Sequence, residues 1–176
     1  MADDDVLVGR RIVLRRPRID DAEAIFAATA SDPEVTEYLA WKPHPDVEET
    51  RRVITEVFNV GHDHTWVVTM RDTAEIIGQI GYRRPRPHEA GLGYCIARRW
   101  WGEGLMPEAV GAILEHLQQD SRLDRVTAAV HPANTQSTRV LAKCGFTLQA
   151  TLRQYIVLPN LSPVPQDCLL YVRSMR

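Results

Sequence analysis

The stretch Arg98–Gly104, with the sequence Arg-Arg-Trp-Trp-Gly-Glu-Gly, constrains the fold more than any other part of the chain. It follows a β-type run at 91–97 and precedes residues 105–117, whose apolar side chains fall on one helical face. Glycines in such a turn let the backbone approach a ligand, and free N–H groups at a helix start favour an anion such as pyrophosphate. The alternative is a tight structural turn in which Trp100 and Trp101 pack into the core. The turn therefore predicts either an anion-binding loop or a plain strand-to-helix connection.

Hydrophobic periodicity predicts an α+β chain with one mixed central sheet. Strands are expected at 11–15, 65–70, 76–82, 91–97 and 125–131, from 146 onward, and at 167–173. Helices are expected after the capping signatures Asp20 with Glu23 and Asp46 with Glu49, and at 105–117 and 135–143. Residues 38–45 and the polar stretch 83–89 read as loops. A chain of 176 residues then forms one domain over 1–176.

Composition excludes several classes of protein. Hydrophobic residues make up 44% and charged residues 25% of the chain, which is typical of a globular domain. The net charge of -2 gives little reason to expect nucleic acid as a partner. No apolar run has the length of a membrane span, and the acidic start Met1–Asp5 is unlike a secretory signal. We therefore expect a cytoplasmic protein that binds neither membrane nor nucleic acid.

Cysteine and histidine positions give no sign of a metal site or a disulfide framework. Cys95, Cys144 and Cys168 are odd in number and widely spaced, so they read as small buried apolar residues. His62 and His64 form the one close histidine pair, and they lack the further ligands that a zinc site needs. No metal is expected.

The motifs along the chain resemble the GNAT superfamily of N-acetyltransferases, in particular the group of ribosomal-protein alanine N-acetyltransferases. They are Arg-Ile-Val-Leu-Arg at 11–15 with Asp-Asp-Ala at 20–22, Leu-Gly-Tyr at 92–94, the Arg-x-x-Gly-x-Gly turn at 99–104, Asn-x-x-Ser at 134–137, Gly-Phe at 145–146, and Arg153, Tyr155 and Asp-x-x-x-Tyr at 167–171. Each motif alone is weak, and their common order gives the resemblance its strength. It covers nearly the whole chain.

The resemblance implies a three-layer fold whose mostly antiparallel sheet splays between the strands at 92–97 and 126–131. It also implies that acetyl-CoA lies with its pyrophosphate on the backbone amides of 100–106, and that a backbone N–H near Cys95 or Ile96 stabilises the oxyanion. The residues implied to contact the donor are Cys95, Ile96, Arg99, Trp100, Trp101, Gly102, Glu103, Gly104, Leu105, Met106, Asn134, Ser137, Arg139 and Lys143.

Protonation of the CoA thiolate is the first task for a side chain. Many GNAT proteins place a tyrosine four residues before the Gly-Phe pair, where this chain has Leu141. The Asn134-x-x-Ser137 pattern instead matches the alanine acetyltransferases, in which the serine hydroxyl faces the sulfur. The alternative makes Asn134 a helix cap and Ser137 an ordinary first-turn serine.

Removal of a proton from the amine is the second task. Relatives often carry glutamate where this chain has Gly91, so Glu89 or the adjacent His88 is the candidate base, acting through a water. Both also read as solvated loop residues. A strong base is less necessary for an α-amine, whose pKa of about 8 leaves a useful neutral fraction at physiological pH.

The remaining candidates concern binding. Arg139 and Lys143 lie one helical turn apart and either reach the CoA 3′-phosphate or form a solvated face. By analogy with the fold, Tyr38, Trp41 and Tyr155 line the acceptor pocket or pack in the core. Glu103 is expected in solvent or beside an arginine.

The sequence therefore predicts an acetyl-CoA-dependent N-acetyltransferase that acts on a primary amine of a protein N-terminus, a peptide or a small molecule. The alternative is an idle acyl-CoA-binding module, because the positions of the usual glutamate and tyrosine hold Gly91 and Leu141. The sequence leaves open the acceptor, the length of the acyl group and whether the chain forms a homodimer.

Overall fold

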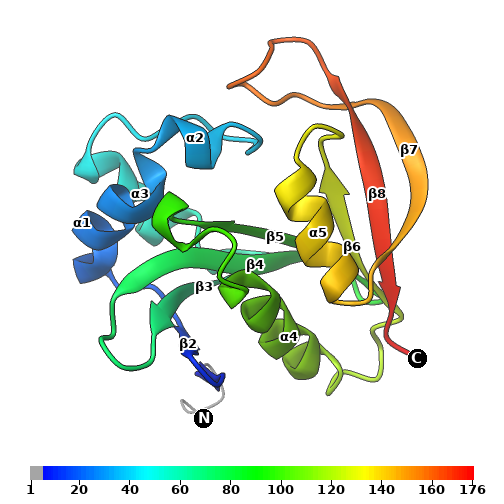
Figure 1. Ribbon diagram of the computed structural model, residues 1–176, viewed down its shortest axis with the longest axis horizontal. Helices are drawn as coiled ribbons and strands as arrows, with labels where there is room; N and C mark the ends of the chain where they lie inside the picture. The colour runs from blue at the N-terminus through cyan, green and yellow to red at the C-terminus, as the bar shows by residue number, and fades with distance from the viewer. Residues whose placement is uncertain (1–5) are drawn as a thin grey trace.

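The computed structural model describes residues 6–176 and contains one eight-stranded sheet (Figure 1). The strand order is β1-β2-β3-β4-β5-β6-β8-β7. All neighbouring strands pair antiparallel except β5 and β6, which pair parallel. The predicted mixed, mostly antiparallel sheet is confirmed. The acidic start at 1–5 lies outside the described residues.

The strands are β1 (Leu7–Val8), β2 (Ile12–Arg15), β3 (Asp63–Met70), β4 (Ile76–Arg86), β5 (Glu89–Ile96), β6 (Arg125–Val130), β7 (Thr147–Ile156) and β8 (Gln166–Ser174). The helices are α1 (Ala22–Ile25), α2 (Pro33–Thr36), α3 (Val47–Glu56), α4 (Leu105–Leu117) and α5 (Thr135–Lys143). Short turns of other helix types lie at η1 (Ile19–Asp21), η2 (Phe26–Ala30) and η3 (Arg98–Trp100). None of the helices within residues 6–176 has the length and apolar character needed to cross a bilayer.

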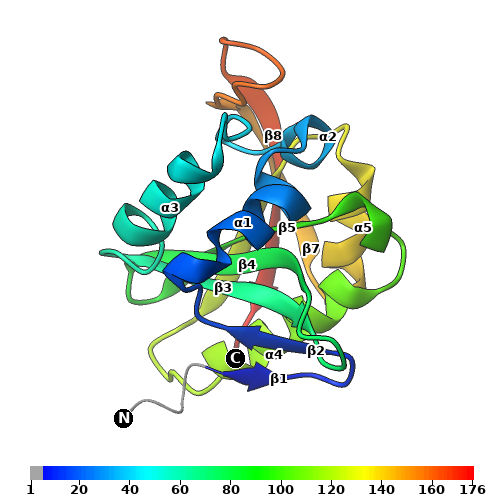
Figure 2. The ribbon, with the colours of Figure 1, turned by 90° about the vertical axis from the view of Figure 1, so that its left-hand side faces the viewer.

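Helices cover both faces of the sheet. Successive β3 side chains point to opposite faces: Trp66 and Val68 join the large core cluster that includes the apolar face of α4, whereas Val67 packs with Ile25 on the other face. Figure 2 shows α1 and α3 side by side above β3 and β4. These layers confirm the expected three-layer arrangement.

Strands β5 and β6 separate after a short paired stretch. Pairing runs from Glu89 with Arg125 to Gly91 with Thr127, and no later pair forms between these strands in the described chain. The remaining residues of β5, up to Ile96, continue without β6 beside them. The predicted splay is therefore confirmed, and it opens toward the N-terminus of α5 (Figure 1).

Two local predictions were wrong. The polar stretch 83–89 is not a loop, because β4 continues to Arg86 and β5 starts at Glu89, with Pro87 and His88 as the turn between them. Strand pairing with β3 and β6 outweighs the polar composition there. The first helical segment is not capped by Asp20: the carboxylate of Asp21 accepts the Arg18 N–H at 2.7 Å.

Sequence reasoning also missed β1 and the short helix α2. Asp32 caps α2 by accepting the Glu34 N–H at 2.9 Å, and Pro33 occupies the first helical position. The signal was present in the Asp-Pro dipeptide. Since α2 is only one turn long, it has no apolar periodicity that could reveal it.

Candidate active site

A groove of ≈ 320 Å³ lies where β5 and β6 separate. One wall comes from the end of β5, the opposite wall from the first turn of α5, and the third side from α2 and the turn after it. Trp101 and Met106 close the end next to the glycine turn. The groove therefore joins the predicted donor loop to the predicted acceptor region.

The glycine turn, whose flanking residues Trp101 and Met106 line this groove, has free backbone donors. The N–H groups of Trp100 and Trp101 are engaged, since they donate to the carbonyls of Ala97 and Arg98 at 2.9 and 3.0 Å. No hydrogen bond within residues 6–176 uses the N–H groups of 102–106, and Gly104 directly precedes helix α4. Backbone N–H groups of 100–106 were expected to be available for the pyrophosphate. Because those of Trp100 and Trp101 are already bonded, only the N–H groups of 102–106 are available.

The backbone of the turn leaves room for an anion. Gly102 and Gly104 have φ values of 83° and 74°, a left-handed conformation that favours glycine. A Cβ on Gly102 would meet nothing within 4 Å, and one on Gly104 would meet only the Arg11 guanidinium, at 3.6 Å. Open space, free N–H groups and a nearby cation together fit a pyrophosphate.

Arg11 fixes the start of α4 from the other end of the chain. Its backbone N–H and Nε donate to the Glu108 carboxylate at 2.7 and 3.0 Å, and its Nη1 donates to the Glu103 carbonyl at 3.0 Å. Burial alone would raise the pKa of Glu108, but the hydrogen bonds and charge of Arg11 outweigh it and leave that pKa below its usual value. Arg11 thus neutralises an acid that would otherwise weaken anion binding.

Ser137 and Tyr94 form a hydrogen-bonded pair on the groove wall. Their hydroxyl oxygens are 2.8 Å apart, and the Tyr94 hydroxyl also lies 3.2 Å from the Ser137 carbonyl oxygen. Burial raises the pKa of Tyr94 well above its usual value, so the phenol stays protonated. Asn134 is the N-cap of α5 and accepts the Ser137 N–H at 3.1 Å, while it also lines the groove.

Cys95 and Ile96 lie at the end of β5, beside the groove. Burial raises the pKa of the Cys95 thiol to about 12, against smaller opposing contributions from Thr29 and Gln79. Ala97 donates to the Ile77 carbonyl on β4, so the alternation of an antiparallel ladder turns the N–H of Ile96 away from β4. The Ile96 carbonyl accepts from the Trp101 indole at 2.9 Å, which fixes that ring at the groove.

Glu89 and Arg99 were expected in the site, but both form ion pairs outside the groove. Glu89 is paired with Arg125 at 2.7 Å, at the closed end of the splay. Glu89 lies six residues before Cys95 along β5, which corresponds to a distance of about 20 Å between them. Arg99 pairs with Glu75 and lines a second pocket that also contains Arg15. Strand register and the turn of η3 therefore take both side chains away from the groove.

Of the remaining candidates, one lines the groove and the others lie in the core or on the surface. Tyr38 lines the groove and stacks on His131, with ring centroids 5.3 Å apart. Trp41 packs against the smaller core cluster, and Tyr155 is 59% exposed on β7. Trp100 packs against the large core cluster, as the structural alternative expected. The exposed candidates are Arg139, Lys143 and Glu103, and the Glu103 backbone contacts Arg11.

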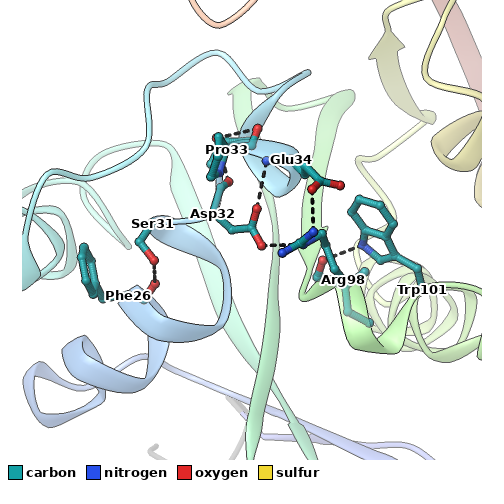
Figure 3. A network of polar contacts seen from close by, with 9 residues as sticks. Phe26, Ser31, Asp32, Pro33, Glu34, Arg98 and Trp101 are labelled. Carbon is teal, nitrogen blue, oxygen red and sulfur yellow. Dashed lines mark hydrogen bonds and ion pairs between the residues drawn. The ribbon is translucent and has the colours of Figure 1, made fainter.

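An ion-pair network joins α2 to the turn after β5. The Arg98 guanidinium donates to Asp32 at 2.8 Å and to Glu34 at 2.5 Å, so it connects the cap of α2 to the start of the glycine turn (Figure 3). Sequence reasoning missed Arg98 as well as the position of Tyr94 opposite Ser137. Only long-range contacts create these pairs, and no local pattern signals them.

Comparison with known proteins agrees with this geometry. Residues 11–147 match the family model described as acetyltransferase (GNAT) domain. The chain is 30% identical over 156 residues to the "Uncharacterized N-acetyltransferase p20" of Bacillus licheniformis. The match covers 86% of this chain and 87% of the relative. It is 33% identical over 90 residues to the "[Ribosomal protein uS5]-alanine N-acetyltransferase" of Escherichia coli, across 49% and 46% of the two chains.

Among solved structures, Mycobacterium smegmatis RimJ in complex with CoA-disulfide superposes with a TM-score of 0.85. The identity is 22%, and the match covers 98% of this chain and 88% of the other. Fold, groove and family match thus agree. The chain belongs to the GNAT acetyltransferase family, whose members are acetyl-CoA-dependent acyltransferases.

Proposed function

We propose that this enzyme transfers the acetyl group of acetyl-CoA to a primary α-amine, with a polypeptide N-terminus as the preferred acceptor. The observation that carries the proposal is the groove between the end of β5 and the first turn of α5, which has the glycine turn with its free N–H groups next to one end and Ser137 on its wall. The alanine N-acetyltransferase relative supports an α-amine as the acceptor.

In this proposal the N–H groups of 102–106 bind the pyrophosphate and the thioester arm lies along the open edge of β5. The Ile96 N–H, which points away from β4, stabilises the negative charge that develops on the thioester oxygen. Arg139 and Lys143 on the exposed face of α5 bind the 3′-phosphate. Together these contacts place the carbonyl carbon beside Ser137.

The reaction itself needs few side chains. The amine nitrogen attacks the carbonyl carbon, a C–N bond forms, and the C–S bond breaks. The leaving thiolate takes a proton from the Ser137 hydroxyl, which recovers one from solvent, while the amine releases its own proton to solvent. In the reacting complex the Tyr94 phenol turns its single proton from the Ser137 carbonyl oxygen, 3.2 Å away, to Ser137 Oγ, 2.8 Å away, which leaves the serine proton directed at the sulfur.

The proposal assigns no general base to Glu89, because that carboxylate is paired with Arg125 at the far end of β5. An α-amine with a pKa of about 8 is partly neutral at neutral pH, so solvent suffices as the proton acceptor. A lysine ε-amine, with a pKa of about 10.4, would react more slowly for the same reason.

Thiol release from acetyl-CoA tests the proposal. Wild-type protein is mixed with acetyl-CoA and either peptides with a free N-terminus, N-blocked peptides with one lysine, or small amines. We expect release of CoA with free N-terminal peptides and a loss of about 10²-fold in kcat for Ser137→Ala, with little change in the KM for acetyl-CoA. Binding of acetyl-CoA without thiol release for every acceptor would overturn the proposal and leave an idle acyl-CoA-binding module.

A further inference from the structure

The acceptor side of the groove carries negative charge and no positive charge. Of the described residues that line it, Glu34 and Glu37 are the charged ones, and none is an arginine, lysine or histidine. Both glutamates belong to α2 or to the turn that follows it, across from Ser137. The charged groups of the groove lining are therefore two carboxylates.

The two glutamates are not equivalent. Glu34 receives a charge-assisted hydrogen bond from Arg98 at 2.5 Å, so its charge is compensated within the protein (Figure 3). Glu37 is exposed at the groove, and no ion pair or hydrogen bond of its carboxylate occurs within residues 6–176. Glu37 is thus the uncompensated charge of the acceptor wall.

The backbone that presents Glu37 is held from both sides. Leu39 donates to the Thr36 carbonyl at 2.9 Å, which closes the turn. The side-chain amide of Asn160, on the loop between β7 and β8, donates to the carbonyls of Thr36 and Trp41 at 2.7 and 2.8 Å. Stacking of Tyr38 on His131 ties the same turn to the end of β6. Glu37 therefore sits on a segment whose position is fixed before any acceptor arrives.

We infer that Glu37 makes the groove selective for cationic acceptors: it binds the α-ammonium or a basic side chain next to it, and it rejects acceptors with an acidic second residue. This inference rests on the proposed function of the groove. Primary α-amines arrive mostly as ammonium ions near neutral pH, and a carboxylate in a partly enclosed groove attracts them while it repels anions. Asn160 acts as a positioning residue for the turn that carries Glu37.

Three tripeptide amides with a free N-terminal alanine test the inference: Ala-Lys-Ala, Ala-Ala-Ala and Ala-Asp-Ala. For wild type we expect the kcat/KM to fall in that order, by about tenfold from the lysine to the aspartate peptide. Glu37→Gln should raise the KM for the lysine peptide about tenfold and remove the discrimination, with the KM for acetyl-CoA unchanged. Glu37→Lys should invert the order of the peptides.

Two further variants separate charge from structure. Asn160→Leu keeps nearly the size of the side chain and adds no charge, but it cannot donate to Thr36 and Trp41, so it should weaken the discrimination while the charge of Glu37 remains. Glu115→Gln removes an exposed carboxylate on α4, away from the groove, and should match wild type. A loss of discrimination in Glu37→Gln that also appears in Glu115→Gln would overturn the inference.

Equilibrium binding of the same peptides to the protein with bound CoA makes the test independent of turnover. Preferential binding of the lysine peptide, lost in Glu37→Gln, would support the inference even if no peptide were acetylated, an outcome that would end only the proposed function. Turnover with equal kcat/KM for the lysine and aspartate peptides would overturn the inference and leave the proposed function standing.

Discussion

Removal of the Tyr94 hydroxyl tests the proposed role of the pair that it forms with Ser137. Tyr94→Phe deletes the 3.2 Å hydrogen bond to the Ser137 carbonyl oxygen and the 2.8 Å neutral hydrogen bond to Ser137 Oγ, and the second is the bond proposed to act on the leaving thiolate. Such a bond contributes about 1 kcal/mol, which corresponds to about fivefold in rate if it acts only in the transition state. We therefore expect kcat to fall about fivefold with an unchanged KM for acetyl-CoA, since the Tyr94 hydroxyl bonds to Ser137 and not to the backbone of 102–106.

The assay follows CoA release at saturating acceptor for wild type, Tyr94→Phe, Ser137→Ala and the double variant. Because Tyr94 acts through Ser137, the double variant should be no slower than Ser137→Ala, which gives a coupling free energy of about 1 kcal/mol. Tyr171→Phe, which removes a phenol from β8, is the matched control and should retain the wild-type rate.

Burial keeps Tyr94 protonated, so the loss in Tyr94→Phe should be the same across about pH 6 to 9. Additive losses in the double variant, or a loss confined to the KM for acetyl-CoA, would refute the relay from Tyr94 to Ser137. An unchanged kcat in Tyr94→Phe would refute it equally.

Three other perturbations have outcomes that follow from the structure. Cys95→Ala should keep kcat within a few fold and the kinetics should stay sequential, because a buried thiol with a pKa of about 12 forms no acyl-enzyme; an acetylated Cys95 detected by mass spectrometry would contradict this. Gly104→Ala should lower the free energy of unfolding by about 1–2 kcal/mol through its φ of 74°, measured by urea denaturation, and wild-type stability would show that the turn is not held in that conformation. Asp21→Asn should cost about 2 kcal/mol near neutral pH, because Asp21 accepts from Arg15 at 2.7 and 2.8 Å, whereas the exposed Asp20→Asn should cost little.

The pH dependence of the Asp21 effect has a definite sign. Burial alone would raise the pKa of Asp21, but hydrogen bonds from Arg15 and Arg18 and the charge of Arg15 hold it below the usual value. The stabilisation is therefore fully present above the unfolded-state pKa of about 3.9 and is lost as the pH falls through the lower folded pKa. Denaturation at several pH values should show the penalty of Asp21→Asn constant above about pH 5 and shrinking in acid, and a penalty that grows in acid would contradict the assignment.

Local sequence patterns predicted most of the helices and strands. The run of β-forming residues at 65–70 and the amphipathic run at 105–117 each correspond to one element with nearly the predicted ends, because both faces of β3 and one face of α4 pack into the core clusters. The turn at 83–89 was misread, since its polar composition says nothing of the partners that β4 and β5 find in β3 and β6. Whether such a segment is a strand or a loop depends on its pairing with neighbouring strands, which are distant in the sequence.

In the site, too, the local features were predictable from the sequence and the long-range contacts were not. The glycine turn and the Asn134-x-x-Ser137 spacing were visible in the sequence because their geometry is set within one turn of chain. The bond from Tyr94 to Ser137 joins residues 43 apart, and the bond from Asn160 to Thr36 joins residues 124 apart. Glu89 lies two residues before Gly91 on β5, as the sequence shows. Its distance from the groove, however, depends on where β6 stops pairing with β5, and no local pattern gives that point.

The most direct measurement follows the backbone N–H resonances of 102–106 while CoA is added to the isotopically labelled protein. These groups lack partners within the described chain, so the pyrophosphate should shift the resonances of Gly102 and Gly104 strongly, and inorganic pyrophosphate should shift them in the same direction at higher concentration. The Trp100 and Trp101 N–H groups, already bonded within η3, should move less. Saturable CoA binding that leaves the resonances of 102–106 unmoved would contradict the account.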